Sequence, residues 1–278
     1  MPYIIGVAVL AALFLLYLFL ISPNFGRRPQ MKELFKFNYA HRGLHKLEAG
    51  VPENSLAAFA AAADGGFGME LDVQITKDGG LVVFHDYNLS RICGVDGEIK
   101  DMIVSELKLF PLSGTSECIP SFDEVLSLVN GKAPLVVEIK GESMDTTVCQ
   151  KVYAALQGYC GDYVIESFNP VYLHWWRKNA PHVLRGQLSA NLLKEDVNGF
   201  SDWVKKWVIK NLLTNFYIKP DFIAYDWRDE KGLSFRLCRD LFKAPSAFWT
   251  VGNEETFQKL KYKCDTVIFE GFLPSSEV

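Results

Sequence analysis

The stretch FGMELDVQITKDGGLVVFHD, residues 67–86, contains two apolar runs that are separated by only four residues, KDGG. A parallel crossover needs a dozen or more residues, so the second run must return antiparallel to the first. The Asp-Gly pair at 78–79 is typical of a hairpin turn. We therefore expect residues 81–86 to form a hairpin strand above a barrel mouth, outside the barrel wall, with an insertion over residues 87–120.

On both sides of this hairpin, short apolar runs alternate with amphipathic segments. The expected strands are 37–41, 67–73, 134–140, 163–168, 182–188, 221–226, 247–251 and 265–271. The expected helices are 55–66, 121–131, 149–161, 171–180, 234–243 and 253–263. Strand–helix alternation predicts a parallel sheet, and about eight strands in one α/β domain predict a closed (β/α)8 TIM barrel.

Length and composition agree with one such domain. The chain has 278 residues, close to the roughly 250 of a typical barrel. Its net charge of -4 argues against a nucleic-acid-binding surface, which usually carries a basic excess. The six cysteines form no C-x-x-C pair and have no histidine cluster beside them, which indicates reduced structural thiols and an intracellular location.

The first segment predicts a membrane anchor. Ile4 to Ile21 is an uncharged run of about 18 residues, the length of a membrane-spanning helix. Neither a basic n-region nor a small-x-small cleavage site accompanies it, so we expect a retained anchor and no cleaved signal peptide. The domain boundaries that follow are 1–32 for the anchor and a linker, with the linker-like part at about 22–32, and 33–278 for the barrel domain.

Basic residues after the anchor predict its orientation. The first four after the apolar run are Arg27, Arg28, Lys32 and Lys36, and none precedes it. Because positive charge stays on the cytoplasmic side, we expect a single-pass membrane protein with a cytoplasmic catalytic domain.

Carboxylates gather near the ends of two expected strands, where barrel enzymes place their chemistry. Glu70 and Asp72 lie two apart and share a face, and Glu138 and Lys140 repeat this spacing on the next barrel strand. Apolar neighbours indicate buried strands, in which carboxylates need a partner. One divalent cation, Mg²⁺ or Ca²⁺, suits three such oxygen ligands better than Zn²⁺ does. The alternative is neutralisation by Arg42 and Lys140 alone.

The stretch NYAHRGLHKLEAGVPENSLAAF, residues 38–59, places His41 and Arg42 at a strand end, and His85 ends the hairpin strand. One histidine at a strand end is more often structural. Two beside a metal site favour acid–base catalysis. Arg42 and Lys140, which could simply neutralise the carboxylates, could equally hold a phosphate group.

Two later side chains complete the expected rim. Gln187 lies near the end of the strand at 182–188, and Trp249 near the end of the strand at 247–251. We expect both to contact substrate, although a core position is the usual one for any tryptophan.

The order and spacing of several short motifs resemble the glycerophosphodiester phosphodiesterase family. The resemblance covers residues 37–271, and its motifs are A-H-R-G, P-E-N-S-L-x-A-F, E-L-D-V-Q-I-T-K-D-G, L-V-V-F-H-D-Y-N-L-S-R, I-P-S-F-D-E-V-L, V-E-I-K, S-F-N-P and F-W-T-V. The family is a TIM barrel that uses a divalent cation to hydrolyse glycerophosphodiesters to an alcohol and glycerol 3-phosphate.

The resemblance also implies roles for single residues. These are His41 and His85 as the acid–base pair, Glu70, Asp72 and Glu138 as metal ligands, Arg42 and Lys140 as phosphate contacts, and Glu53 as the acid of P-E-N. One histidine would deprotonate a neighbouring glycerol hydroxyl while the other protonates the leaving alcohol. Water would then open the resulting cyclic phosphate.

Two motifs depart from the family pattern. Residues 269–274 read F-E-G-F-L-P where T-D-x-P is usual, and Gly252 separates Val251 from Asn253 where W-T-V-N is usual. Both lie in the half of the rim that the substrate headgroup would contact, so the identity of the alcohol stays open.

The sequence thus predicts a membrane-anchored phosphodiesterase that acts on a glycerophosphodiester or a lysophospholipid; it identifies no protein partner. One rival is a lysophospholipase D-type lipid phosphodiesterase, which the anchor favours. Another is a catalytically inactive, membrane-tethered barrel. Two histidines and three carboxylates argue against the inactive barrel, because a dead relative would usually have lost at least one of them.

The segment GFSDWVKKWVIKNLLTNFYIK, residues 199–219, has apolar residues at helical spacing. One interpretation is a helix packed on the outer wall of the barrel. The other is a helix in the membrane interface, because tryptophan beside lysine is typical of such helices.

Overall fold

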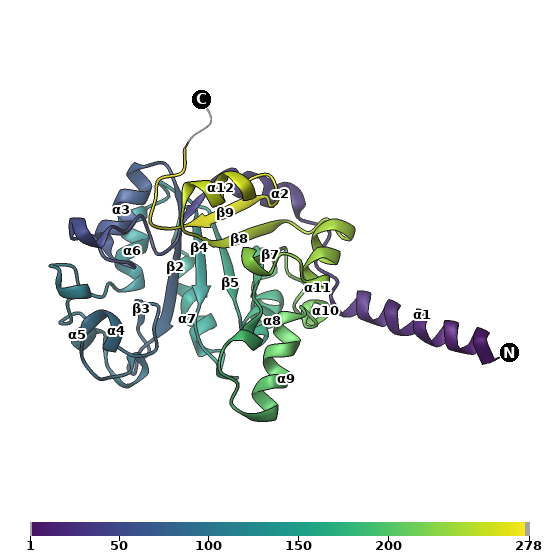
Figure 1. Cartoon of the computed structure of the whole chain (residues 1–278). Coiled ribbons are helices and arrows are strands. Elements are labelled where there is room, and N and C mark those ends of the chain that lie inside the picture. The colour runs from purple at the N-terminus through teal and green to yellow at the C-terminus, as the bar shows by residue number, and fades with distance from the viewer. Residues whose placement is uncertain (1, 276–278) are drawn as a thin grey trace.

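Eight parallel strands close into a barrel in the computed structural model, which describes residues 2–275 (Figure 1). The strands are β1 (Tyr39–Ala40), β2 (Gly68–Ile75), β4 (Leu135–Ile139), β5 (Tyr163–Ser167), β6 (Arg185–Ser189), β7 (Phe222–Asp226), β8 (Ser246–Val251) and β9 (Thr266–Phe269). They follow one another around the wall, and β1 closes it by pairing with both β9 and β2. The predicted barrel is confirmed, and each strand lies at its expected place.

The hairpin lies outside the wall, as predicted, but its strand ends at Val83 and does not extend to residue 86. β3 (Leu81–Val83) pairs antiparallel with the last residues of β2, and Val73 stands opposite Val83. Gly79 adopts φ +75°, a conformation that glycine takes without strain in the turn. The insertion that follows carries α4 (Ser90–Cys93) and α5 (Val104–Leu107), which pack over a small apolar cluster of their own.

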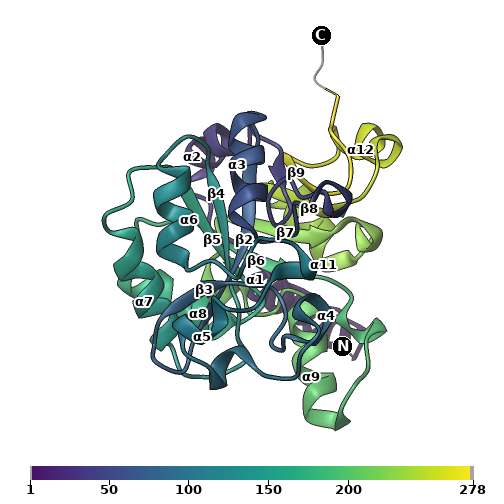
Figure 2. The same cartoon turned by 90° about the vertical axis from the view of Figure 1, so that its left-hand side faces the viewer.

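Helices surround the barrel (Figure 2). They are α3 (Leu56–Asp64), α6 (Phe122–Val129), α7 (Thr147–Leu156), α8 (Pro170–Asn179), α11 (Leu233–Arg236) with a π-helical turn at Leu237–Leu241, and α12 (Glu254–Leu260). Side-chain caps start several of them: Ser55 accepts from the Ala58 amide, and Asn253 from the Thr256 amide. These caps fix where each helix leaves the strand before it.

The segment expected to be a linker is packed against the barrel. Asn24 and Arg27 both bind the carboxylate of Asp221, and α2 (Arg28–Leu34) follows. Met31 is fully buried in the cluster that fills part of the barrel, so α2 covers one barrel end. The apolar residues of this short segment are too few to show helical periodicity in the sequence, and tertiary packing orders them.

The N-terminal helix α1 (Pro2–Leu20) projects from the body (Figure 1). Among the described residues, its stretch Tyr3–Leu20 is the only helix that is long and apolar enough to cross a membrane. Its last turn contacts the barrel domain: the Tyr17 hydroxyl lies 2.7 Å from the Ser234 hydroxyl, and Ile21 is fully buried.

The segment at 199–219 forms two helices, α9 (Gly199–Lys210) and α10 (Asn215–Ile218). The single helix suggested by the apolar spacing is therefore wrong beyond Lys210. Leu212 is fully buried with φ +54°, so packing of this side chain overrides the helical periodicity.

Candidate active site

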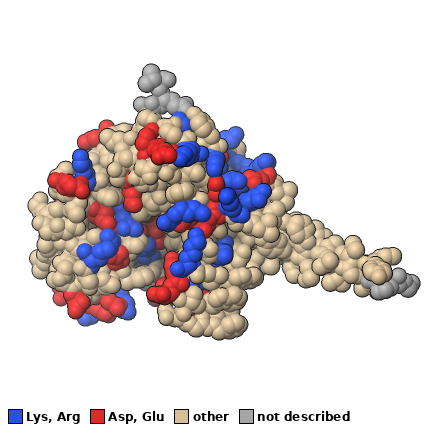
Figure 3. All heavy atoms as spheres, in the orientation of Figure 1, with Lys and Arg blue, Asp and Glu red and all other residues tan. Residues whose placement is uncertain are grey.

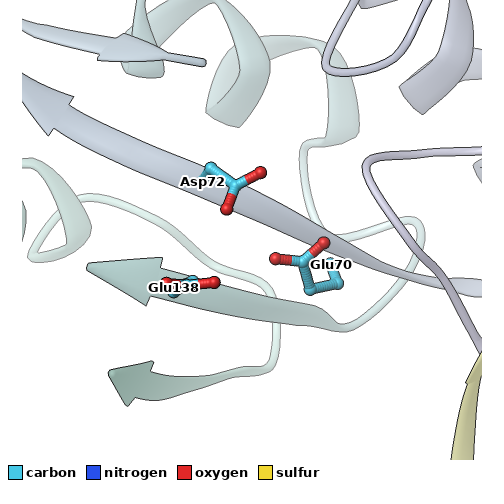
Figure 4. Close-up of side chains that lie close together, drawn as sticks. All are labelled: Glu70, Asp72 and Glu138. Carbon is cyan, nitrogen blue, oxygen red and sulfur yellow. The ribbon is translucent and has the colours of Figure 1, made fainter. Parts of the chain in front are cut away.

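Three buried carboxylates on neighbouring strands converge (Figure 4). Glu70 and Asp72 share a face of β2, and Asp72 stands opposite Glu138 of β4 in the sheet register. One oxygen from each of the three lies within 4.8 Å of the others. The strand spacing predicted this cluster, and the structure brings together all three predicted metal ligands.

Cationic side chains line the cluster. Lys140 Nζ lies 3.2 Å from Asp72 Oδ1 and 3.0 Å from Glu138 Oε1. Arg42 Nε lies 3.4 Å from Asp72 Oδ2, and its backbone amide donates to Glu70 Oε2. Three carboxylates thus face two cationic side chains.

Burial and mutual repulsion raise the pKa of two of these carboxylates. Burial, together with the charges of Asp72 and Glu138, holds the pKa of Glu70 well above its usual range. Burial and the Asp72 charge raise the pKa of Glu138 to about 7, against the opposing effect of Lys140. Carboxylate oxygens are suitable ligands for a divalent cation. The charge of a bound cation would lower the pKa values of Glu70 and Glu138, so that both carboxyl groups ionise.

Asp72 remains the ionised member of the cluster. Burial disfavours its charge, but Lys140, His85 and Arg42 outweigh that effect and hold its pKa well below the usual range. The Asn54 amide also donates to Asp72 Oδ2 at 2.8 Å. Asn54 is itself buried, and this bond gives its amide nitrogen a partner within the site.

His41 is oriented by a residue whose partnership the sequence did not reveal. Its Nδ1 lies 2.7 Å from Glu270 Oε2, and its Nε2 lies 3.9 Å from Glu70 Oε2. Burial lowers the pKa of His41, partly offset by Glu270, while hydrogen bonds from His41 and His45 hold the pKa of Glu270 well below its usual range. Glu270 directly follows β9, so its place at a strand end was the available signal.

The second histidine has a similar arrangement. His85 Nδ1 lies 2.6 Å from Asp86 Oδ1, and burial lowers the pKa of the imidazole. Arg91 of α4 binds both Asp86 and Glu53, and Glu53 also accepts from Arg42 Nη1 at 2.7 Å. A chain of ion pairs therefore links His85 to Arg42 through the insertion, a link that local sequence spacing does not show.

Gln187 and Trp249 lie apart from this network. Gln187 is fully buried, and its Nε2 donates to the Leu188 carbonyl at 2.7 Å. Trp249 packs edge-on against Phe168, with 5.9 Å between ring centroids. Among the described residues, Gln187 Oε1 and Trp249 Nε1 have no hydrogen-bond partner, so their predicted substrate contacts stay predictions.

Glu166 of β5 is a further buried carboxyl group that the sequence did not single out. It stands opposite Glu138 in the sheet register. Burial and the charges of Glu138 and Asp72 hold its pKa well above the usual range, which favours its protonated form. Glu166 is not one of the three carboxylates whose oxygens converge.

Known proteins resemble this chain in sequence and fold. The sequence profile of the "Glycerophosphoryl diester phosphodiesterase family" matches residues 41–270. A protein from Caldanaerobacter subterraneus subsp. tengcongensis, named glycerophosphodiester phosphodiesterase, is 39% identical over 160 residues. That alignment covers 54% of this chain and 65% of the relative, so the match spans slightly less than two thirds of the relative's length.

Solved structures share the fold. A phosphodiesterase from Oleispira antarctica, in complex with its product sn-glycerol-3-phosphate, superposes with a TM-score of 0.67 and 22% identity over 84% of this chain and 92% of that chain. A glycerophosphodiester phosphodiesterase from Thermotoga maritima gives a TM-score of 0.64 and 25% identity over 84% and 93%. At 22% identity, the similarity to the Oleispira structure shows only that the two chains share the barrel fold.

Proposed function

The chain belongs to the glycerophosphoryl diester phosphodiesterase family, and from this premise we propose that it hydrolyses glycerophosphodiesters to an alcohol and glycerol 3-phosphate. The observation that carries the proposal is the buried cluster of Glu70, Asp72 and Glu138, bordered by two carboxylate-bound histidines. Cationic side chains beside these acids suit a phosphate diester, which is an anion.

The three carboxylates would hold one divalent cation, Mg²⁺ or Ca²⁺. When bound, it supplies positive charge that stabilises the phosphoryl oxygens. Arg42 and Lys140, already directed toward the cluster, would bind the same oxygens and orient the diester. Glu53 holds the guanidinium of Arg42 in place from the other side.

The two histidines would move the protons. In each, Nδ1 is held by a carboxylate, so Nε2 is the nitrogen left to face the substrate. One imidazole accepts the proton of the glycerol hydroxyl next to the diester as that oxygen attacks phosphorus. The other protonates the departing alcohol oxygen, and water then opens the cyclic phosphate to glycerol 3-phosphate.

Glu270 would act as the positioning residue of His41. We expect Glu270→Gln to lower kcat by roughly 10-fold or more with little change in KM, since the lost charge orients the imidazole rather than the substrate. Glu270→Ala should lose more activity than Glu270→Gln, because glutamine keeps a hydrogen-bond acceptor at this position. Steady-state kinetics on glycerophosphocholine measure both, and equal kcat values in all three proteins would rule the role out.

The opposite half of the rim would bind the rest of the substrate. Gln187 and Trp249 each leave one buried polar atom without a partner among the described residues, as groups awaiting a ligand do. These two side chains would contact the glycerol or alcohol part of the diester.

The apolar helix α1 supports membrane anchoring, which we include in the proposal. No residue of its span Tyr3–Leu20 is buried, and the residues just after it are fixed to the barrel by Ile21 and Asn24. Such fixation favours a retained anchor over a cleaved signal sequence. The basic residues that follow α1 favour a cytoplasmic barrel.

Anchoring also favours a second candidate activity, the hydrolysis of lysophospholipids in the manner of a phospholipase D. Release of glycerol 3-phosphate from glycerophosphocholine, compared with release of choline from lysophosphatidylcholine, distinguishes the two activities. An inactive, membrane-tethered barrel would release neither product.

A further inference from the structure

The helix α9 carries an apolar surface that the fold does not bury. Among its residues only Ile209 is buried, whereas 80% of the Phe200 surface, 42% of Trp203 and 41% of Trp207 are exposed. A helix that covers the barrel buries a continuous face, as α6 does. Packing of α9 on the outer wall of the barrel therefore does not explain why its exposed face is apolar.

The exposed residues form one continuous stripe. At about 100° per residue, Phe200, Trp203, Val204 and Trp207 share a face directly opposite Ile209. Their rings stack along the helix: the Phe200 and Trp203 centroids lie 6.1 Å apart, and those of Trp203 and Trp207 lie 6.3 Å apart. We call these four residues the aromatic stripe.

The C-terminal end of α9 lies beside the point where α1 leaves the domain. Tyr17 of α1 shares a hydrogen bond with Ser234, whose hydroxyl donates to the side chain of Asn211, the C-cap of α9. Figure 1 shows α9 running across the direction of α1. If α1 crosses a bilayer, α9 runs along the surface of that bilayer.

We propose that the aromatic stripe lies in the interface of the membrane that α1 crosses, an inference that rests on the membrane anchoring proposed above. Helices with one apolar face and basic flanks lie in the plane of the membrane interface, where tryptophan is enriched. At about 100° per residue, Lys206 lies beside the Trp203 edge of the stripe, whereas Lys205 lies nearer Ile209. In Figure 3 the surface over the lower part of α9 and that over the described part of α1 are tan, without charged side chains.

The membrane contact would also place the active site. Lys205 of α9 binds Glu142 at 3.1 Å, and Glu142 lies two residues beyond Lys140 at the end of β4. The helix α9 therefore adjoins the rim of the barrel mouth, with its stripe on the face turned away from Ile209. With the aromatic stripe in the membrane interface, the barrel mouth opens beside the lipid headgroups and binds diesters that lie at the bilayer surface.

The test uses the full chain reconstituted into vesicles of phosphatidylcholine and phosphatidylglycerol, with or without bromine on the upper part of the acyl chains. Bromine quenches tryptophan that enters the lipid. Because the chain has six tryptophans, the signal is assigned with Trp203→Phe/Trp207→Phe, which keeps aromatic rings in the stripe. Trp175→Phe is the matched control, since Trp175 packs against Tyr153 of α7 and lies outside the stripe.

We expect brominated lipid to quench the wild type and the Trp175→Phe protein to a similar degree, and the double variant to lose most of that quenching. Vesicle flotation reports the anchor separately. A chain that fails to float with the vesicles overturns the anchor and this inference together. A chain that floats but is not quenched, or a double variant that is quenched like the wild type, overturns this inference alone.

Discussion

His41→Ala and His85→Ala should each lower kcat by about 10²-fold or more, the usual consequence of losing a general acid or base. KM should change much less, because Arg42, Lys140 and the carboxylate cluster, rather than either imidazole, are proposed to bind the phosphate. Each imidazole is fixed through Nδ1, by Glu270 or by Asp86, which leaves its Nε2 for the proton transfer. Steady-state kinetics with glycerophosphocholine provide the measurement.

A matched control is His182→Ala, since His182 is exposed and lies against Tyr153 outside the site. This variant should keep wild-type kinetics. If the double variant His41→Ala/His85→Ala turned over within about 10-fold of the wild type, the acid–base assignment would be wrong.

The second large effect concerns the carboxylates. Glu70→Gln, Asp72→Asn and Glu138→Gln should each leave a folded protein that needs far more cation for activity. Removing a metal ligand should weaken cation affinity by more than the roughly 10- to 100-fold that follows from removing a hydrogen-bond partner of such a ligand. Thermal unfolding gives an independent readout: cation at 100 times its Kd stabilises the folded wild type by about 2.7 kcal/mol, and the variants should lose this gain.

Glu166→Gln serves as the matched control for this series. Glu166 is a buried carboxyl group on the neighbouring strand, and its raised pKa makes the amide a close mimic of its protonated form. The Glu166→Gln protein should need the same cation concentration for activity as the wild type. An Asp72→Asn protein that keeps full activity in chelator would show that the site is misassigned.

The barrel could be predicted from the sequence because each strand is a short apolar run and several helices begin with a local cap. The hairpin was equally predictable, since four residues cannot form a parallel crossover. Other parts of the fold depend on tertiary packing and could not be predicted. The burial of Met31 and the end of α9 before Leu212 depend on contacts with distant segments, which leave little local pattern.

The candidate site likewise combines residues that the sequence predicts with residues that it does not. Glu70, Asp72 and Glu138 converge because strand spacing and barrel topology fix their positions. Glu270 and Arg91 could not be assigned partners from the sequence: Glu270 departs from the family motif, and Arg91 ends a quoted motif within the insertion. Their roles depend on loops that bring them to His41 and Glu53, and only the folded structure shows that.

The most direct test of the account measures the products that the purified full chain forms from glycerophosphocholine, with divalent cation and with chelator. The account predicts release of glycerol 3-phosphate and choline in equal amounts with cation, and of neither in chelator. Undiminished release in chelator, or cleavage that yields phosphocholine and glycerol, would contradict it.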